Sequence, residues 1–175
     1  MTQYSKRLVV IHWLTVLLFA GAFYMGSTLD GIEQPAAKLA LYPVHFLGGI
    51  LLLVLTALRL WFRLSDGAPA PAQGGSAIAN RAAILGHKLL YVLLFALPLS
   101  GLLMIVQTGV LSAVLANDPT KLPDLEKFSV HELHGSIATA LLVVALAHFA
   151  AALYHQFFLK DGLLRRMVLR RFAEK

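Results

Sequence analysis

Four long stretches without a charged side chain dominate the pattern of hydrophobic and polar positions along this chain of 175 residues. They run from Leu8 to Leu29, from Leu39 to Leu58, from Leu89 to Asn117 and from Leu133 to Leu159. Each approaches or exceeds the roughly 20 residues that a helix needs to cross a bilayer. The pattern therefore predicts an all-α, integral membrane four-helix bundle in which residues 1–175 form one domain, with spans at about 8–28, 42–62, 86–108 and 133–157.

The first stretch begins close to the N-terminus, where a secretory signal peptide would also lie. It contains no small-residue cleavage site of the Ala-x-Ala type, and His12 interrupts its apolar run. We therefore interpret this stretch as a retained membrane span.

The composition agrees with a membrane protein and limits the chemistry. Hydrophobic residues make up 58% of the chain and charged residues 14%, whereas soluble domains contain roughly 45–50% and 25%. The chain has no cysteine, which excludes disulfides, iron–sulfur clusters, thiolate-bound metals and covalently attached c-type haem. Any bound metal must therefore be held by nitrogen or oxygen.

The basic residues are divided unevenly between the two ends of the predicted spans. Only Lys38, Lys121 and Lys127 fall in the first and third loops. The other twelve lie at the N-terminus, around the second loop or in the tail: Lys6, Arg7, Arg59, Arg63, Arg81, Lys88, Lys160, Arg165, Arg166, Arg170, Arg171 and Lys175. Because cytoplasmic segments carry the excess of Lys and Arg, both termini are predicted to be cytoplasmic. The net charge of +6 then reflects topology and attraction to membrane lipid, and we expect no nucleic-acid partner.

Two loops have a distinct composition. Residues Ala68 to Ala77 form a linker rich in Pro and Gly, and Asn117 to Glu132 form an acidic outer loop that is broken by prolines. The first predicts an irregular cytoplasmic connection, and the second predicts a short helical turn.

Four histidines lie inside the predicted spans. His134 and His148 are fourteen residues apart, so on one helix they leave nearly the same face, roughly 21 Å apart along the axis. The alternating direction of the spans places His45 near the level of His134, at the outer end, and His12 near the level of His148, at the inner end. Each level then pairs two histidines from different helices across the bundle core.

Paired histidines at two depths favour two non-covalent haems, because six-coordinate haem iron takes one axial nitrogen from each face of the porphyrin. Small residues one turn after a ligand would let a flat macrocycle approach the helices: Gly49, Ala138 and Ala152. Cations at the helix ends are candidate partners of the haem propionates: Arg7, Arg59 and Lys88 at the inner end and Lys38 at the outer end.

Other interpretations of these histidines remain open. A lone histidine in a membrane helix is more often a hydrogen-bonded packing residue than a ligand. A zinc or di-iron centre is less favoured, because no Asp or Glu lies within the charge-free stretches to complete it. His131 is expected to be a surface or supporting group, and it is an alternative to His134 as a ligand.

His87 and His155 lie near the inner boundary of their spans. His155 follows His148 by seven residues on nearly the same helix face, so it is predicted to point into the bundle below the inner cofactor. A neutral imidazole there could hydrogen-bond a quinone carbonyl and relay its proton. The alternative for both residues is an interfacial histidine with no such role.

Four segments carry a resemblance to a known family: YSKRLVVIHW, PVHFLGGILLLVLTALRLWFRL, GHKLLYVLLFALPLSGLLM and HGSIATALLVVALAHFAAALYHQFFLKDGLLRRM. In this order, and with their histidines, they resemble the bacterial cytochrome b561 family over nearly the whole chain. The resemblance implies a multi-pass dihaem b-type cytochrome of the bacterial inner membrane. It implies His12 and His148 as ligands of the cytoplasmic-side haem iron, and His45 and His134 as ligands of the periplasmic-side haem iron. His87 and His155 match family histidines at the quinone end.

The resemblance also implies a quinone-linked oxidoreductase in electron transport. Similar members include superoxide oxidases, which pass an electron from superoxide outside to ubiquinone. The outer loops here are acidic apart from Lys38, Lys121 and Lys127, so attraction of superoxide would have to be local. A periplasmic redox partner is the other candidate electron donor. Two further alternatives are a haem-bearing docking subunit for a separate dehydrogenase and a non-haem transporter that uses histidines for metal or protons.

Overall fold

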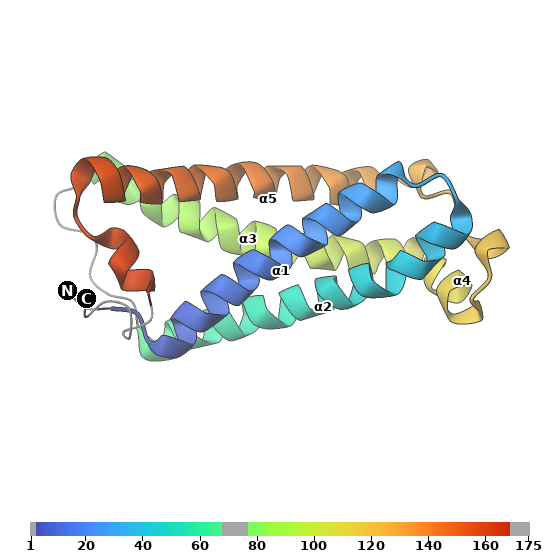
Figure 1. Ribbon diagram of the computed structural model, residues 1–175, viewed down its shortest axis with the longest axis horizontal. Helices are drawn as coiled ribbons and strands as arrows, with labels where there is room; N and C mark the ends of the chain where they lie inside the picture. The colour runs from blue at the N-terminus through green and yellow to red at the C-terminus, as the bar shows by residue number, and fades with distance from the viewer. Residues whose placement is uncertain (1–2, 68–76, 169–175) are drawn as a thin grey trace.

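Four long helices run side by side in a computed structural model that describes residues 3–67 and 77–168 (Figure 1). They are α1 (Lys6–Gly31), α2 (Pro35–Asp66), α3 (Ala77–Thr108) and α5 (Ser129–Tyr154), and α5 continues into a π-helical turn, η3 (His155–Leu159). All four are long enough and apolar enough to cross a membrane. Within the described ranges the chain forms no β-strand. The predicted all-α fold with four membrane-spanning helices is confirmed.

The helix ends follow local sequence signals. Ser5 is the N-cap of α1, and its side chain accepts a hydrogen bond from the backbone N–H of Leu8. Pro35 occupies the first turn of α2, where its missing N–H costs nothing, and Gly67 ends that helix with a φ of +75°. The start of α3 at Ala77 precedes the expected boundary at residue 86, so this helix extends beyond the apolar stretch. Of the predicted linker, residues 68–76 lie outside the described part of the chain.

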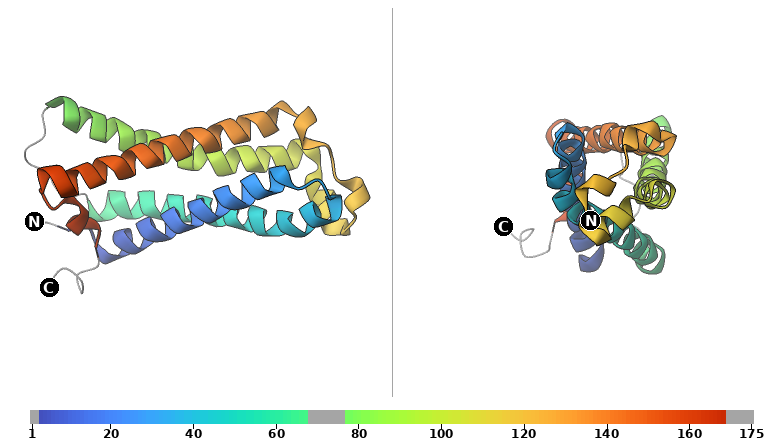
Figure 2. Two further views of the ribbon diagram at one scale, coloured as in Figure 1. Left: turned by 45° about the horizontal axis from the view of Figure 1, so that its top comes forward. Right: turned by 90° about the vertical axis from the view of Figure 1, so that its right-hand side faces the viewer.

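At one end of the bundle the chain turns aside instead of continuing α3. Gly109 has a φ of +68°, a conformation that favours glycine, and it separates α3 from the short helix α4 (Val110–Ala116). Two 3₁₀ turns, η1 (Pro119–Lys121) and η2 (Leu125–Lys127), follow before α5 begins. They confirm the short helical turn that was predicted in the acidic loop. The end-on view in Figure 2 shows α4 and this loop lying across the end of the bundle, which we call the loop end.

The interior is a narrow apolar core to which all four long helices contribute. Its buried cluster comprises Phe19, Leu52, Leu94, Leu97 and Leu141. The closest helix pairs are α1 with α2 and α3 with α5, and α2 also packs against α3. Many large apolar side chains point outward instead; Leu17, for example, is 68% exposed. Such outward apolar faces are expected where lipid replaces water as the surrounding solvent.

The opposite end brings the two ends of the described chain together, and we call it the terminal end. The indole N–H of Trp13 donates to the carbonyl of Met167 at 2.9 Å, and the backbone N–H of Tyr4 donates to the carbonyl of Arg166 at 3.3 Å. Met167 and Arg166 belong to the 3₁₀ helix η4 (Leu163–Met167), which folds back beneath the bundle. The start of α1, the end of α2 and the segment after α5 therefore share one end of the molecule.

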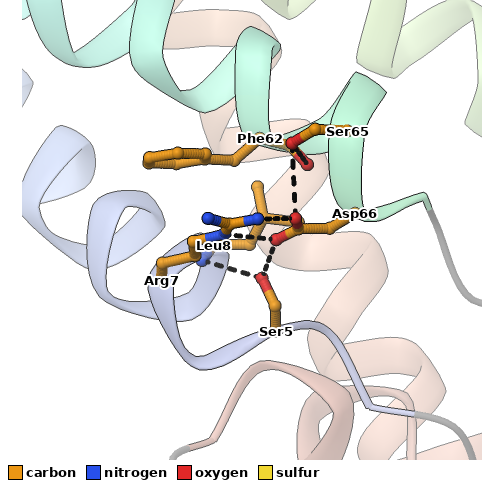
Figure 3. A network of polar contacts seen from close by, with 6 residues as sticks. All are labelled: Ser5, Arg7, Leu8, Phe62, Ser65 and Asp66. Carbon is orange, nitrogen blue, oxygen red and sulfur yellow. Dashed lines mark hydrogen bonds and ion pairs between the residues drawn. The ribbon is translucent and has the colours of Figure 1, made fainter.

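A polar network joins α1 to α2 at the terminal end (Figure 3). Arg7 forms an ion pair with Asp66, and the hydroxyl of Ser5 donates to the same carboxylate at 2.5 Å. The Arg7 guanidinium also lies over the ring of Phe62, 4.5 Å from its centre. Arg7, a predicted partner of a haem propionate, is thus engaged with Asp66 at the surface.

Candidate functional site

Two histidines face each other near the loop end. His45 comes from α2 and His134 from α5, and their ring centres are 6.2 Å apart with the ring planes at 80°. Two metal–nitrogen bonds of about 2 Å, with roughly 1 Å from each nitrogen to its ring centre, span about 6 Å. The structure thus brings together the outer pair that was predicted from the sequence, at a separation that suits one metal ion between two imidazoles.

Glycines on the other two helices make room for this pair. A Cβ atom at Gly26 of α1 would lie 3.3 Å from Cε1 of His45, and one at Gly101 of α3 would lie 3.2 Å from Cε1 of His134. Both distances are shorter than ordinary van der Waals contact. Gly49, which was predicted to give a macrocycle room, touches neither ring, because a Cβ there would meet nothing within 4 Å. The glycines that touch the rings thus lie on neighbouring helices, which spacing along one helix does not reveal.

A serine hydroxyl holds the ring of His134. The Oγ atom of Ser100 lies 2.8 Å from Nδ1 of His134, and the same hydroxyl bonds to the carbonyl of Leu97 at 2.7 Å. Ser100 is only 6% exposed. Because Ser100 and Gly101 are adjacent in α3, this helix supplies both a hydrogen-bonding group and a clear space for the imidazole of α5.

Three histidines gather nearer the terminal end. His87 of α3 and His148 of α5 have ring centres 5.2 Å apart at 72°. His12 of α1 lies within electrostatic range of both. The structure therefore places His12 and His148 at one level, as predicted, and adds His87 to them. The contact between His87 and His148 is not predicted by the sequence, where His87 matches a histidine at the quinone end.

A cation from α2 accompanies this cluster. Arg59 interacts electrostatically with His12 and His148, and its guanidinium carbon lies 5.6 Å from the ring centre of Tyr91. Arg59 is partly buried, whereas Lys88 is exposed. Of the inner cations considered from the sequence, Arg59 is the one that the structure places beside the histidines.

His155 takes part in a separate pair below this cluster. It begins the π-helical turn η3, and its Nδ1 lies 2.5 Å from a carboxylate oxygen of Asp161. The other carboxylate oxygen accepts the backbone N–H of Leu163 at 3.0 Å. Burial alone would raise the pKa of Asp161, but the bonds from His155 and Leu163 favour the charged form and hold its pKa below the ordinary value. An ionised Asp161 can only accept, so Nδ1 of His155 carries the shared proton.

His131 lies apart from the facing pair. Its Nε2 atom is 3.4 Å from a carboxylate oxygen of Asp30, so it connects the start of α5 to the end of α1. His134 is the residue whose ring faces His45. This arrangement agrees with the expectation that His131 is a surface or supporting group.

Two lysines in the acidic loop form ion pairs with nearby carboxylates. Lys121 pairs with Asp118 and Lys127 with Asp124, each at 3.2 Å. Hydrogen bonds from the hydroxyl and backbone N–H of Thr120, together with Lys121, lower the pKa of Asp118. Two of the three lysines at the loop end therefore already have a carboxylate partner.

Comparisons with known proteins agree with this arrangement. The family model for prokaryotic cytochrome b561 matches residues 3–170. The chain belongs to the prokaryotic cytochrome b561 family. Cytochrome b561 homolog 1 of Escherichia coli (strain K12) is 31% identical over 98% of this chain and 99% of its own length. Cytochrome b561 homolog 2 of the same strain is 31% identical over 95% and 91%, and a probable superoxide oxidase of Yersinia pestis is 28% identical over 95% and 96%.

Membership of the cytochrome b561 family makes this a bacterial membrane haem protein and implies b-type haem. The residues present fit such a group, because two imidazoles from different helices, those of His45 and His134, could bind the iron of one haem from both sides. Across residues 3–67 and 77–168, no three His, Asp or Glu side chains are arranged to hold a metal ion. The donors thus come as an imidazole pair, which suits haem better than a zinc site with three or four protein ligands. The alternative of a non-haem transporter is set aside because the cytochrome b561 family implies haem.

Proposed function

We propose that this cytochrome b561 holds two haems and carries electrons across the membrane to or from ubiquinone. In this proposal His45 and His134 are the axial ligands at the loop end, and His12 and His148 are those at the terminal end. The observation that carries the proposal is the pair of facing imidazoles, 6.2 Å apart, from two different helices. When bound, haem supplies reversible one-electron chemistry at its iron.

Residues from all four long helices would surround the two proposed haems. Gly26 of α1 and Gly101 of α3 leave room for the loop-end rings, because a Cβ atom at either position would lie within 3.3 Å of a ring carbon. Arg59 brings positive charge to the terminal-end histidines, which suits the carboxylates of haem propionates. The apolar side chains between the two levels, including Leu52 and Leu141, exclude water from the path. Both levels lie on α5, roughly 21 Å apart along its axis.

Replacing one histidine of a pair should remove the corresponding haem and leave most of the other. His45→Ala or His134→Ala is expected to lose the loop-end haem, and His12→Ala or His148→Ala the terminal-end haem. The measurement is the ratio of haem to protein in purified preparations, with His131→Ala as the matched control that keeps both. A haem-replete wild-type protein with one haem per chain would contradict the proposal.

We also propose that the terminal end faces the cytoplasm and that the protein resides in the inner membrane. The division of basic residues supports this, because twelve of the fifteen Lys and Arg residues belong to the terminal end or its flanking segments. The loop end, in contrast, carries six carboxylates, from Asp30, Glu33, Asp118, Asp124, Glu126 and Glu132.

A reporter enzyme that is active only in the periplasm tests this orientation. The reporter should be inactive when it is fused after Lys175, and active when it is fused to a chain that ends after Lys127. The two fusion points should lie on opposite sides of the membrane, because α5 crosses it between them. Activity of the first fusion together with inactivity of the second would reverse the proposed topology.

For the quinone, we propose a site at the terminal end that is served by His155 and Asp161, with His87 beside it. The ionised Asp161 accepts a hydrogen bond from Nδ1 of His155, so Nε2 is the ring nitrogen that could bond to a ligand. Reduction of ubiquinone to ubiquinol consumes two electrons and two protons. A histidine that is oriented by a carboxylate at the cytoplasmic boundary can hold and pass those protons.

His155→Ala and Asp161→Asn should each slow the oxidation of reduced haem by a short-chain ubiquinone by about tenfold or more, and leave both haem spectra intact. The first substitution removes the proton-carrying ring, and the second removes its charged acceptor at nearly unchanged volume. Stopped-flow absorbance measures the rate, and Tyr154→Phe, a change at the neighbouring exposed position, is the control. Wild-type rates in both variants would exclude this site.

As the electron donor at the loop end we propose superoxide, so that the overall reaction is that of a superoxide:ubiquinone oxidoreductase. Two superoxide ions would each lose one electron and leave as dioxygen. The similarity to a probable superoxide oxidase supports this choice. Because Lys121 and Lys127 are paired with carboxylates, Lys38 is the loop-end cation best able to attract an anion. A protein donor, as expected for a docking subunit of a dehydrogenase, is the alternative.

The rate of haem reduction by superoxide should fall as ionic strength rises, because about 1 M salt shortens the screening length to roughly 3 Å. Lys38→Gln should lower the rate at low salt, and Lys88→Gln, at the terminal end, should not. Rapid mixing with a superoxide solution provides the measurement. A rate that is insensitive to salt and to Lys38, or no reduction by superoxide, would favour a protein partner as donor.

A further inference from the structure

We propose that Ser100 is a positioning residue that holds His134 in one tautomer and thereby sets the reduction potential of the loop-end haem. The proposal rests on the proposed two-haem function and adds a residue on α3 to a site whose ligands come from α2 and α5. Its basis is the contact of 2.8 Å between the Ser100 hydroxyl and Nδ1 of His134.

The direction of this hydrogen bond follows from the number of protons available. A serine hydroxyl has one hydrogen to donate, and the hydroxyl of Ser100 gives it to the carbonyl of Leu97 at 2.7 Å. Toward His134 the Ser100 oxygen can then only accept. Nδ1 of His134 must therefore carry a hydrogen, and the remaining nitrogen, Nε2, keeps its lone pair for a metal.

The surroundings keep the ring in this orientation. Ser100 is only 6% exposed, so water has little access to replace the bond. Gly101 lies directly beside the ring, where a Cβ atom would come within 3.2 Å of Cε1. The imidazole is thus held at Nδ1 by one residue of α3 and closely approached at Cε1 by the next. Metal-bound histidines commonly donate their second N–H in this way, which fixes the ring and raises its basicity.

The two imidazoles of the loop-end pair differ in this respect. In the described part of the chain no hydroxyl or carboxylate bonds to His45, whose polar neighbour is the backbone of Ala22 on α1. Ser100 therefore acts on one axial ligand only. A more basic imidazole donates more electron density to iron and favours the oxidised form, so loss of the Ser100 hydroxyl should make the loop-end haem easier to reduce.

The test is a redox titration of the purified two-haem protein, followed by its absorption bands. Ser100→Ala should shift the one-electron equilibrium of the loop-end haem toward the reduced form by up to about tenfold, which equals about 59 mV, with the terminal-end haem unchanged. Ser100→Thr should restore the wild-type potential, because a threonine hydroxyl in a helix also reaches a carbonyl three or four residues back. Thr56→Val removes a buried hydroxyl that bonds to the carbonyl of Leu52 and should shift neither haem.

Each outcome decides the proposal. A purely structural role for Ser100 would lower the haem content of Ser100→Ala without moving the potential of the haem that remains, and this result would overturn the proposal. An upward shift that Ser100→Thr fails to reverse would overturn it as well. Failure of the two-haem function is recognised separately, because wild-type protein would then bind fewer than two haems, or His134→Ala would leave both haems in place.

Discussion

An imidazole ring in a hydrocarbon environment needs polar partners, and this requirement governs how the four helices are set against one another. Leaving a polar group unpaired in an apolar medium costs roughly 2–7 kcal/mol. The structure meets this need at three of the histidines, where His134 lies against Ser100, His131 against Asp30 and His155 against Asp161. Leucine and lipid are equally apolar, so apolar contacts alone define helix register weakly in a membrane. The polar pairs supply the missing specificity.

The four long helices contribute different parts of the loop-end site. At the loop end α2 and α5 contribute the facing rings, while α1 and α3 contribute the space around them through Gly26 and Gly101. α3 contributes additional hydrogen bonding through Ser100. A bundle of four helices is therefore the smallest arrangement in which two helices can present ligands and two others can support them from both sides.

The membrane spans and the two histidine levels could be predicted from the sequence. Spans follow from the absence of charge, and levels follow from helical periodicity, because both depend on the neighbours of a residue along one helix. Contacts between different helices cannot be predicted from the neighbours of a residue along its own helix. Nothing in the spacing of α3 indicates that Ser100 meets His134, or that His87 meets His148, since both depend on how α3 rotates about its own axis. Arg7 illustrates the same difficulty, because its partner Asp66 lies 59 positions away.

The position of both histidine levels on α5 has a consequence for the evolution of the chain. Within a single helix the vertical distance and the relative direction of His134 and His148 are fixed by covalent geometry, whatever the neighbouring helices do. One residue inserted or deleted between them would turn one ring by about 100° and move it by about 1.5 Å relative to the other. A change of length in this interval therefore disturbs the pairing at one level, whereas a substitution leaves the spacing of the two histidines unchanged. α5 therefore fixes the spacing of the two levels, whereas the positions of His12 and His45 depend on how α1 and α2 pack against each other and against the other helices.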